Sequence, residues 1–414
     1  MTPHELDALL LDGHPGARGL LSPLGQRAAM PLGIPQQSEQ AKGVLRNATI
    51  GQITDGAGRP LALPSLEKHF SGFPDTQALL YAPQAGLLAL REAWQRRLAL
   101  PEGTPASLPV VTMGITHGLS LCADLFTGPS VPVVVATPYW DNYELIFTMR
   151  TGAPLVTYPV FGPDRRFNVE RLRAALARLS GPAVVLLNFP SNPTGYSPYP
   201  DEAEAIVALL AAHPLPLCVV CDDAYTGLFF DPSLYGTSLF PALAAALDPR
   251  RSLACKVDGA TKELVFFGGR VGFLTFSAGG GAGRALAEKA AAVLRGTLSS
   301  GSRPAQAAVL GALASPTLAD EQAAVLATLR ERYEVLRDAL AAHGLTPWPF
   351  NSGCFALLAL PSGQIAEDVR QRLLAKHSVG VIAVPSANAL RIAFCSLDAR
   401  EIPDLVNRIV AGIG

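Results

Sequence analysis

The sequence predicts an α/β protein in which a large, doubly wound and mostly parallel sheet is joined to a smaller α+β domain. From about residue 85, short apolar runs bounded by Gly and Pro alternate with segments of helical periodicity. Continuous Val, Leu and Ile runs are typical of parallel strands buried on both faces, and their alternation with helices favours a doubly wound sheet. After about residue 305 a long helical stretch leads to short strands around one more helix, which indicates the second domain.

Seven apolar runs are the strand candidates of the large domain. They are PVVTMG (109–114), VPVVVATP (131–138), APLVTYPV (153–160), PAVVLLNF (182–189), PLCVVCDD (216–223), SLACKVDG (252–259) and VGFLTFS (271–277). Amphipathic helices are predicted at 86–99 and 168–179.

The C-terminal region has a different texture. It is expected to form a long helical stretch over 305–344, strands at 355–360, 379–385 and 389–396, and a helix over 365–378. Residues 1–45 are rich in Pro and Gly and are expected to be irregular. We therefore divide the chain into an N-terminal arm with part of the small domain (1–47), a large domain (48–305) and a small C-terminal domain (306–414).

The composition excludes several classes of protein. Of 414 residues, 49% are apolar and 16% are charged, which is enough apolar matter for a large core and excludes intrinsic disorder. The formal net charge of −1 offers no basic surface for nucleic acid or an anionic membrane. No apolar run is long enough for a membrane span, and the N-terminus lacks the pattern of a secretory signal. We therefore expect a cytoplasmic protein.

Neither cysteines nor histidines suggest a metal centre. Cys218 and Cys221 form a C-x-x-C pattern, but they lie in a predicted buried strand, where positions i and i+3 face opposite sides. The seven His residues show no ligand spacing. Six cysteines, mostly inside apolar runs, are typical of a reduced protein rather than a disulfide scaffold.

Polar residues follow the predicted strands at the edge where open parallel sheets bind ligands. A Gly114–Thr116 turn precedes a helix and can offer backbone N–H groups to a phosphate. The turn residues Asn192–Gly195 follow the fourth strand, and Asp222 ends the fifth, where a buried carboxylate needs a cationic partner or several donors. Lys262 lies eight residues before Arg270, and lysine is the residue that forms Schiff bases.

In this order, these residues resemble the fold-type I pyridoxal 5'-phosphate (PLP) enzymes, specifically the class I/II aminotransferases. The resemblance covers about residues 33 to 396 and rests on Tyr81, Gly114–Thr116, Trp140, Asn192–Gly195, Asp222, Tyr225, Lys262, Arg270 and Arg391. It implies the PLP-dependent transferase fold, PLP as the cofactor and a homodimer.

The resemblance also implies a role for each cofactor-binding residue. Lys262 is expected to form the Schiff base with PLP and to move the proton of the substrate, while Asp222 keeps the pyridine nitrogen protonated. Asn192 and Tyr225 are expected to hydrogen-bond the phenolic oxygen of the ring. Trp140 is expected to stack on the ring, with Tyr139 as the alternative if the turn is shifted by one residue.

The phosphate is expected to bind the Gly114 turn, the amides of Ile115 and Thr116, the hydroxyl of Thr116 and the guanidinium of Arg270. The resemblance further implies that Tyr81 reaches this phosphate across the subunit interface.

Substrate binding is expected at the other end of the site. Arg391 is expected to hold the α-carboxylate in a bidentate fork, with Asn192 and Gly33 beside it. In aspartate aminotransferases a segment similar to the one around Arg295 reaches into the partner's site, so Arg295 is a candidate for selecting a dicarboxylic substrate. A solvated arginine at the end of a helix is the alternative interpretation.

Some positions depart from the family pattern or admit rivals. Gly259 stands where the family usually has a phosphate-binding Ser, and Thr261 is the candidate replacement. Lys256 is a rival Schiff-base lysine, although it lies inside a strand pattern. The cluster Gly279–Gly283 matches no dinucleotide or P-loop motif and is expected to be a loop.

The resemblance implies an aminotransferase that moves an amino group between an α-amino acid and a 2-oxo acid, with glutamate and 2-oxoglutarate as the expected shared pair. A β-elimination lyase or a decarboxylase on the same scaffold is the alternative. The ligand-sensing half of a transcription regulator is a third interpretation, disfavoured because only about 45 non-basic residues precede the predicted fold.

Overall fold

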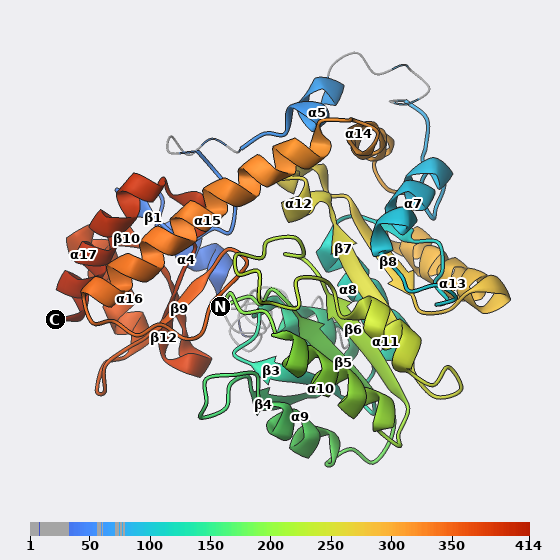
Figure 1. The fold of residues 1–414 in the computed structure, drawn as a ribbon, viewed down its shortest axis with the longest axis horizontal. Coiled ribbons are helices and arrows are strands. Elements are labelled where there is room, and N and C mark those ends of the chain that lie inside the picture. The colour runs from blue at the N-terminus through green and yellow to red at the C-terminus, as the bar shows by residue number, and fades with distance from the viewer. Residues whose placement is uncertain are drawn as a thin grey trace.

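The computed structural model describes residues 8, 33–55, 59, 61–70, 74, 77 and 79–414. In this part of the chain a seven-stranded sheet forms the centre (Figure 1). Its strands are β2 (Val110–Thr112), β3 (Val133–Thr137), β4 (Leu155–Pro159), β5 (Ala183–Asn188), β6 (Leu217–Asp222), β7 (Leu253–Gly259) and β8 (Gly272–Phe276). Each lies inside one of the seven predicted apolar runs.

The order of the strands is β2-β8-β7-β6-β5-β3-β4. All pairs are parallel except those of β8, which runs antiparallel to both β2 and β7. The chain steps outward from β3 to β4 and then returns to place β5 on the other side of β3. This reversal is the position at which doubly wound sheets bind their ligands, beyond the carboxyl ends of the strands.

Helices cover both faces of the sheet, so the predicted doubly wound α/β architecture is confirmed. One core packs under α8 (Ile115–Phe126), and the other lies under α9 (Val169–Leu176), α10 (Pro200–Ala212) and α11 (Phe240–Ala246). Cys218 packs against the first core and Cys221 belongs to the second. The two thiols therefore face opposite sides of β6, as expected for positions i and i+3 of a strand.

The remaining helical elements are short except along the C-terminal half. They are α4 (Ile34–Gln40), α5 (Pro64–Glu67), η1 (Lys68–Phe70), α7 (Leu88–Gln95), η2 (Arg96–Leu98), η3 (Glu144–Met149, a π-helix), α12 (Ala260–Glu263), η4 (Phe267–Gly269), α13 (Gly280–Leu298), α14 (Arg303–Leu313), α15 (Leu318–Ala342), α16 (Ala366–His377), η5 (Pro385–Ala387), η6 (Phe394–Ser396), η7 (Ala399–Glu401) and α17 (Ile402–Ile413). None of the described helices combines the length and apolar character that a membrane crossing requires.

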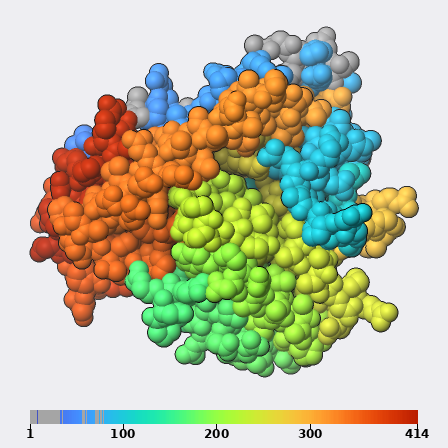
Figure 2. Space-filling model, viewed as in Figure 1, coloured from blue at the N-terminus to red at the C-terminus, as the bar shows by residue number. Residues whose placement is uncertain are grey.

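The C-terminal elements gather at one end of the molecule, where Figure 2 shows them in orange and red beside the green segments of the sheet region. A three-stranded antiparallel sheet, β11-β12-β9, is built from β9 (Ala356–Ala359), β11 (Ile382–Val384) and β12 (Ala389–Ile392). The long helix α15 runs from these elements towards α14 (Figure 1). Helix α14 packs on α5 and α7, which come from the N-terminal part of the chain. The expected limits of the domains stay predictions.

Three local expectations need correction. Residues 34–40 form helix α4 rather than irregular chain, while residues 1–7 and 9–32 lie outside the described residues. The expected continuous stretch over 305–344 is divided into α14 and α15 around Pro316. The predicted loop at Gly279–Gly283 is instead the start of α13, where a Cβ on Gly283 would lie 2.2 Å from the carbonyl oxygen of Ala278.

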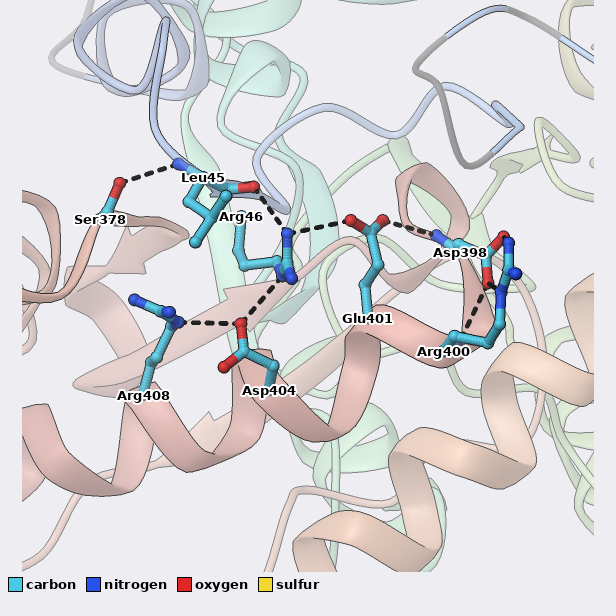
Figure 3. Close-up of polar contacts among 8 residues, drawn as sticks. All are labelled: Leu45, Arg46, Ser378, Asp398, Arg400, Glu401, Asp404 and Arg408. Atoms are coloured by element: carbon cyan, nitrogen blue, oxygen red, sulfur yellow. Dashed lines mark hydrogen bonds and ion pairs between the residues drawn. The ribbon is translucent and has the colours of Figure 1, made fainter.

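A short N-terminal strand is anchored on the C-terminal elements. Strand β1 (Arg46–Asn47) pairs in parallel with β10 (Val379–Gly380). Its Arg46 lies between two carboxylates of the last helical segments, with Nη1 3.0 Å from Glu401 and Nε 3.0 Å from Asp404 (Figure 3). The second contact is an ion pair without hydrogen-bond alignment. This anchor fixes the start of the segment that continues into the cavity described next.

Candidate active site

A cavity of about 240 Å³ lies at the carboxyl edge of the central sheet, where the chain reverses direction between β3 and β5. Its described lining residues come from both the sheet region and the C-terminal elements. They are Ile34, Ile50, Gly51, Gln52, Ile115, Thr116, Trp140, Tyr143, Asn188, Asn192, Asp222, Ala224, Tyr225, Lys262, Phe267, Phe355 and Arg391.

The N-terminus of α8 and one guanidinium form a donor cluster at this edge. Gly114 has a φ of +80°, and a Cβ there would lie 2.3 Å from Nη2 of Arg270, so only glycine permits this close approach. Arg270 is held by a bond of 3.0 Å from Nη1 to the carbonyl oxygen of Phe267. No side chain caps α8, and Ile115 and Thr116 of its first turn line the cavity. This donor set suits a phosphate.

Asp222 is a buried carboxylate at the end of β6. It accepts hydrogen bonds from Oη of Tyr143 at 2.5 Å and from the amide of Ala224 at 3.3 Å. Burial raises the pKa of Asp222 to about 6, although the Tyr143 bond and the nearby charge of Lys262 oppose the shift. Such a carboxylate lacks a full counter-charge and suits a protonated ring nitrogen.

Lys262 lies in the short helix α12 directly after β7. Its Nζ lies 4.8 Å from the ring centroid of Tyr225. Burial lowers the pKa of Lys262. The charge of Arg270 also lowers this pKa, whereas the charge of Asp222 raises it. A lowered pKa favours the neutral amine, which is the form that attacks a carbonyl carbon.

The rival Lys256 has a different environment. Its Nζ lies 2.7 Å from a carboxylate oxygen of Asp223 and 2.7 Å from one of Asp258. Burial disfavours its charge, but these two carboxylates outweigh that effect and hold the pKa of Lys256 above its ordinary value. It is absent from the described lining of the cavity. Lys256 and Asp223 therefore satisfy each other within the core, which favours Lys262 and Asp222 as the reactive pair.

Arg391 and Asn192 also line the cavity and contact each other. Nη1 of Arg391 donates to Oδ1 of Asn192 at 2.9 Å, and Nη2 donates to the carbonyl oxygen of Thr49 at 2.7 Å. The guanidinium lies over the ring of Phe355, with its Cζ 4.3 Å from the centroid. Arg391 is buried, and among the described residues its Nε has no hydrogen-bond partner. Arg391 lines the cavity, and each terminal nitrogen keeps a second N–H that suits an anionic ligand.

A second cavity, of about 340 Å³, adjoins the first along Ile34, Trp140, Asn192 and Arg391. Gly33 lines it, and a Cβ on this residue would lie 2.0 Å from Oδ2 of Asp141. Trp140 borders both cavities.

The alternative aromatic, Tyr139, lines the second cavity but not the first, and donates its hydroxyl to Glu144 at 2.9 Å. This arrangement favours Trp140 over Tyr139 for contact with a ring bound in the first cavity.

The turn after β5 joins the sheet region to the C-terminal elements. Gly195 has a φ of +72°, and a Cβ there would lie 1.9 Å from the carbonyl oxygen of Phe355. The carbonyl of Gly195 accepts hydrogen bonds from the amides of Asn351 and Ser352, each at 2.9 Å. Gly195 is thus explained by local geometry and close packing, whereas the buried hydroxyl of Thr194 has no partner among the described residues.

Five predicted residues are absent from the described lining of both cavities, namely Gly114, Thr261, Arg270, Tyr81 and Arg295, and the last two are exposed in the single chain. Tyr81 is 87% exposed, and Arg295 is exposed in the last turn of α13. Both were assigned to a site shared between subunits, so their roles stay predictions.

The departure at Gly259 has a steric reason, because a Cβ there would lie 2.6 Å from the carbonyl oxygen of Val271. Thr261, the proposed replacement, is buried, and its hydroxyl has no partner among the described residues.

Three residues of the site were missed by sequence reasoning. Tyr143 bonds Asp222, and Asn188 donates to the carbonyl oxygen of Asp222 at 2.9 Å while accepting from the amide of Asn192 at 2.8 Å. Asp141 borders the second cavity. A signal existed, since a polar residue that ends an apolar strand and a tyrosine three residues after Trp140 both point to the same sheet edge.

Comparisons with known proteins agree with this fold. The structure resembles an aminotransferase from Anaerococcus prevotii with a TM-score of 0.84 and 22% identity, covering 95% of this chain and 99% of that one. The fold is therefore the PLP-dependent fold type I of aminotransferases.

The model of the family "Aminotransferase class I and II" matches residues 50–409, so the chain belongs to this family. An aspartate/prephenate aminotransferase of Thermus thermophilus is 30% identical over 320 residues, which is 74% of this chain and 75% of that protein. An arginine–pyruvate transaminase of Pseudomonas aeruginosa is 29% identical, covering 73% of each chain. The protein is an aminotransferase, and its cofactor is PLP.

Proposed function

We propose that this aminotransferase moves the amino group of an α-amino acid to a 2-oxo acid, with glutamate and 2-oxoglutarate as one of its pairs. The observation that carries the proposal is a single cavity lined by a half-buried lysine, a buried carboxylate and a buried arginine: Lys262, Asp222 and Arg391. These groups can supply an amine, a counter-charge and a carboxylate clamp.

The residues present fit PLP. Arg270, the Gly114 turn, the amides of Ile115 and Thr116 and the Thr116 hydroxyl would hold its phosphate. The unpartnered hydroxyl of Thr261 supports a further contact there.

Around the ring, Asp222 would pair with the pyridine nitrogen, and the pKa of this carboxyl would fall once a cation lies beside it. Trp140 would cover one ring face, while Asn192 and Tyr225 would donate to the phenolic oxygen.

When bound, PLP withdraws electrons from the substrate Cα and carries the amino group between the two half-reactions. Lys262 would carry the proton to and from Cα, since a lowered pKa favours the neutral amine, which is the form that can accept a proton. Tyr143 and Ala224 would hold Asp222 in place during both half-reactions.

The substrate α-carboxylate would bind Arg391 in a bidentate fork. Asn192 and Thr49 each accept one hydrogen bond from a terminal nitrogen and orient the guanidinium, which leaves the second N–H of each terminal nitrogen for the substrate carboxylate. Gly33 would lie beside the substrate, and its lack of a side chain leaves room for the carboxylate of Asp141. The selection of dicarboxylates by Arg295 stays a prediction that requires a partner subunit.

We further propose a cytoplasmic homodimer. Exposed apolar side chains gather around Tyr81, with Leu79 77%, Leu80 56% and Leu88 56% exposed, and such a patch is typical of an interface. The carbonyl of Tyr81 accepts a bond from Arg303 at 3.0 Å, which fixes the backbone that carries the exposed ring. All six cysteines are free, which supports a reducing compartment.

Incubation of the PLP-loaded enzyme with single amino donors and 2-oxoglutarate tests the function. Stoichiometric formation of glutamate and of the 2-oxo acid derived from the donor is the expected result. Release of ammonia with pyruvate would instead identify the lyase alternative, and release of carbon dioxide would identify the decarboxylase. Lys262→Ala is the matched control and should form no glutamate.

A further inference from the structure

The second cavity has an acidic outer wall. Of the described residues that line it, only Asp141, Glu144 and Arg391 carry a formal charge. Arg391 is 2% exposed and lies at the boundary with the first cavity, whereas Asp141 is half-buried and Glu144 is exposed. The lining of the cavity therefore combines one buried cation with two carboxylates that are more exposed.

The two cavities are neighbours that share part of their lining. They share Ile34, Trp140, Asn192 and Arg391, and the volume of about 340 Å³ lies in the range of small-molecule sites. A donor whose α-carboxylate binds Arg391 would share the first cavity with Lys262, because both residues line it. Its side chain then has the second cavity beside it.

Both carboxylates retain acceptor capacity towards this space. Asp141 accepts one hydrogen bond, from the amide of Ile34 at 3.2 Å, and Glu144 accepts one from Tyr139 at 2.9 Å. An ionised carboxylate has about four acceptor sites. The segment Ile382–Pro385 adds an apolar flank that suits the methylene stem of a long side chain.

Building on the proposed function, we propose that Asp141 and Glu144 select an amino donor whose side chain ends in a cation, of the arginine, ornithine and lysine class. The guanidinium or ammonium group would lie against the two carboxylates while the α-carboxylate binds Arg391. A dicarboxylic donor would bring a second anion towards the same wall, so glutamate would be a slower donor than a cationic amino acid while still forming the proposed pair with 2-oxoglutarate.

A pair of nearly isosteric donors tests this selection. L-arginine and L-citrulline have nearly the same shape, but the end group of citrulline is neutral. With the PLP-loaded enzyme and a fixed 2-oxo acid, kcat/KM should be about tenfold higher for L-arginine, as expected for a partly exposed pair of charges near neutral pH. L-glutamate should be a poorer donor than L-arginine, which is the opposite of the preference expected from the Arg295 prediction.

Variants assign the selection to the carboxylates. Glu144→Gln and Asp141→Asn should each reduce the arginine-to-citrulline ratio about threefold, and the exposed Glu144→Lys should reverse it. Glu334→Gln, an exposed carboxylate on α15, is the matched control and should leave the ratio unchanged. Because Asp141 also bonds the start of α4, the ratio within one variant is the readout rather than absolute activity.

The outcomes separate the two proposals. Amino transfer from L-arginine and L-citrulline at equal kcat/KM, or a ratio that Glu144→Lys does not change, would overturn the selection and leave the aminotransferase function intact. Absence of amino transfer from every donor would contradict the proposed function itself.

Discussion

Nη1 of Arg391 donates a hydrogen bond of 2.9 Å to Oδ1 of Asn192, which joins two residues 199 positions apart in the chain. One comes from β12 of the C-terminal elements and the other from the turn after β5. This contact fixes the orientation of the guanidinium and leaves its Nε unused. The side-chain amide of Asn192 therefore contacts Arg391, the residue that we propose binds the substrate carboxylate.

Arg391→Lys should lower kcat/KM for donor and acceptor about 100-fold, because an ammonium cannot form a bidentate fork. Asn192→Ala should cost less, and a double-mutant cycle should give a coupling of about 1–2 kcal/mol since the two side chains are in contact. Arg370→Lys, another buried arginine that lies on α16, is the matched control and should leave kcat/KM near the wild-type value. Equal losses for both lysine variants would contradict the assignment.

Lys262 and Lys256 should respond differently to chemical labelling. Borohydride reduction of the PLP-loaded enzyme followed by peptide mapping should place the pyridoxyl label on Lys262. Lys256→Met should reduce the free energy of unfolding by about 3–5 kcal/mol, because it leaves two carboxylates buried without their cation, yet the label should stay on Lys262. A label on Lys256 would remove our assignment.

The raised pKa of Asp222 predicts a pH-dependent stability of the protein freed of PLP. A carboxyl whose pKa is higher in the folded protein than in the unfolded chain favours folding when protonated, so stability is lost as pH rises from about 3.8 to about 6. This difference corresponds to about 3 kcal/mol. Asp222→Asn should therefore raise the thermal midpoint at pH 8, where wild-type Asp222 is ionised, while activity with PLP falls by several decades.

Asp338→Asn, which changes an exposed carboxylate on α15, should leave the thermal midpoint near that of the wild type at both pH values. Thermal unfolding of the three proteins without PLP at pH 4.5 and pH 8 measures the effect. An Asp222→Asn variant that is less stable than the wild type at pH 8 would show that the ionised carboxylate is better stabilised than its burial indicates.

Subunit mixing tests whether Tyr81 acts across an interface. Tyr81→Asp should weaken PLP binding by placing a carboxylate near the phosphate, and Lys262→Ala removes the reactive amine. Random exchange of the two inactive dimers should restore about a quarter of the wild-type activity, since half of the dimers become hybrids with one intact site. A mixture as inactive as its parents would place Tyr81 in the site of its own subunit.

The ion pairs of Arg46 should stabilise the segment that follows β1. Arg46→Met should reduce the free energy of unfolding by about 1 kcal/mol. High salt screens the ion pairs, so the difference in free energy of unfolding between the variant and the wild type should be smaller there. Arg59→Met is the matched control, because the Arg59 side chain is 80% exposed in its pair with Asp55 whereas that of Arg46 is 19% exposed. Chemical denaturation at low and high salt measures both. A larger loss for Arg59→Met would contradict the role of the anchor.

The sequence was most informative where the determinants are local. The strands lie where apolar runs end at Gly or Pro, and the Gly114 turn was recognised because strand, glycine and helix follow one another in the chain. The antiparallel direction of β8 could not be read from VGFLTFS, since parallel and antiparallel buried strands share that composition. Pro316, by contrast, was an available signal for the break between α14 and α15.

The contacts that complete the site depend on tertiary structure. Tyr143 lies 79 positions from Asp222, and Asp141 lies 107 positions from Ile34, so no spacing rule connects them. The cofactor itself came from a family resemblance, because lysine, aspartate and arginine at strand ends are compatible with several chemistries.

The close contact between Gly195 and Phe355 has a mechanical consequence. Two backbones meet there with no room for a side chain, and two amides from the segment before β9 bond the same carbonyl. A rigid-body rotation of the C-terminal elements relative to the sheet would have its fulcrum at this junction, because atoms in direct backbone contact can move least. Arg391 lies on β12, away from this junction, so it would move more than the residues at the junction. A small rotation would therefore change the position of its guanidinium in the cavity.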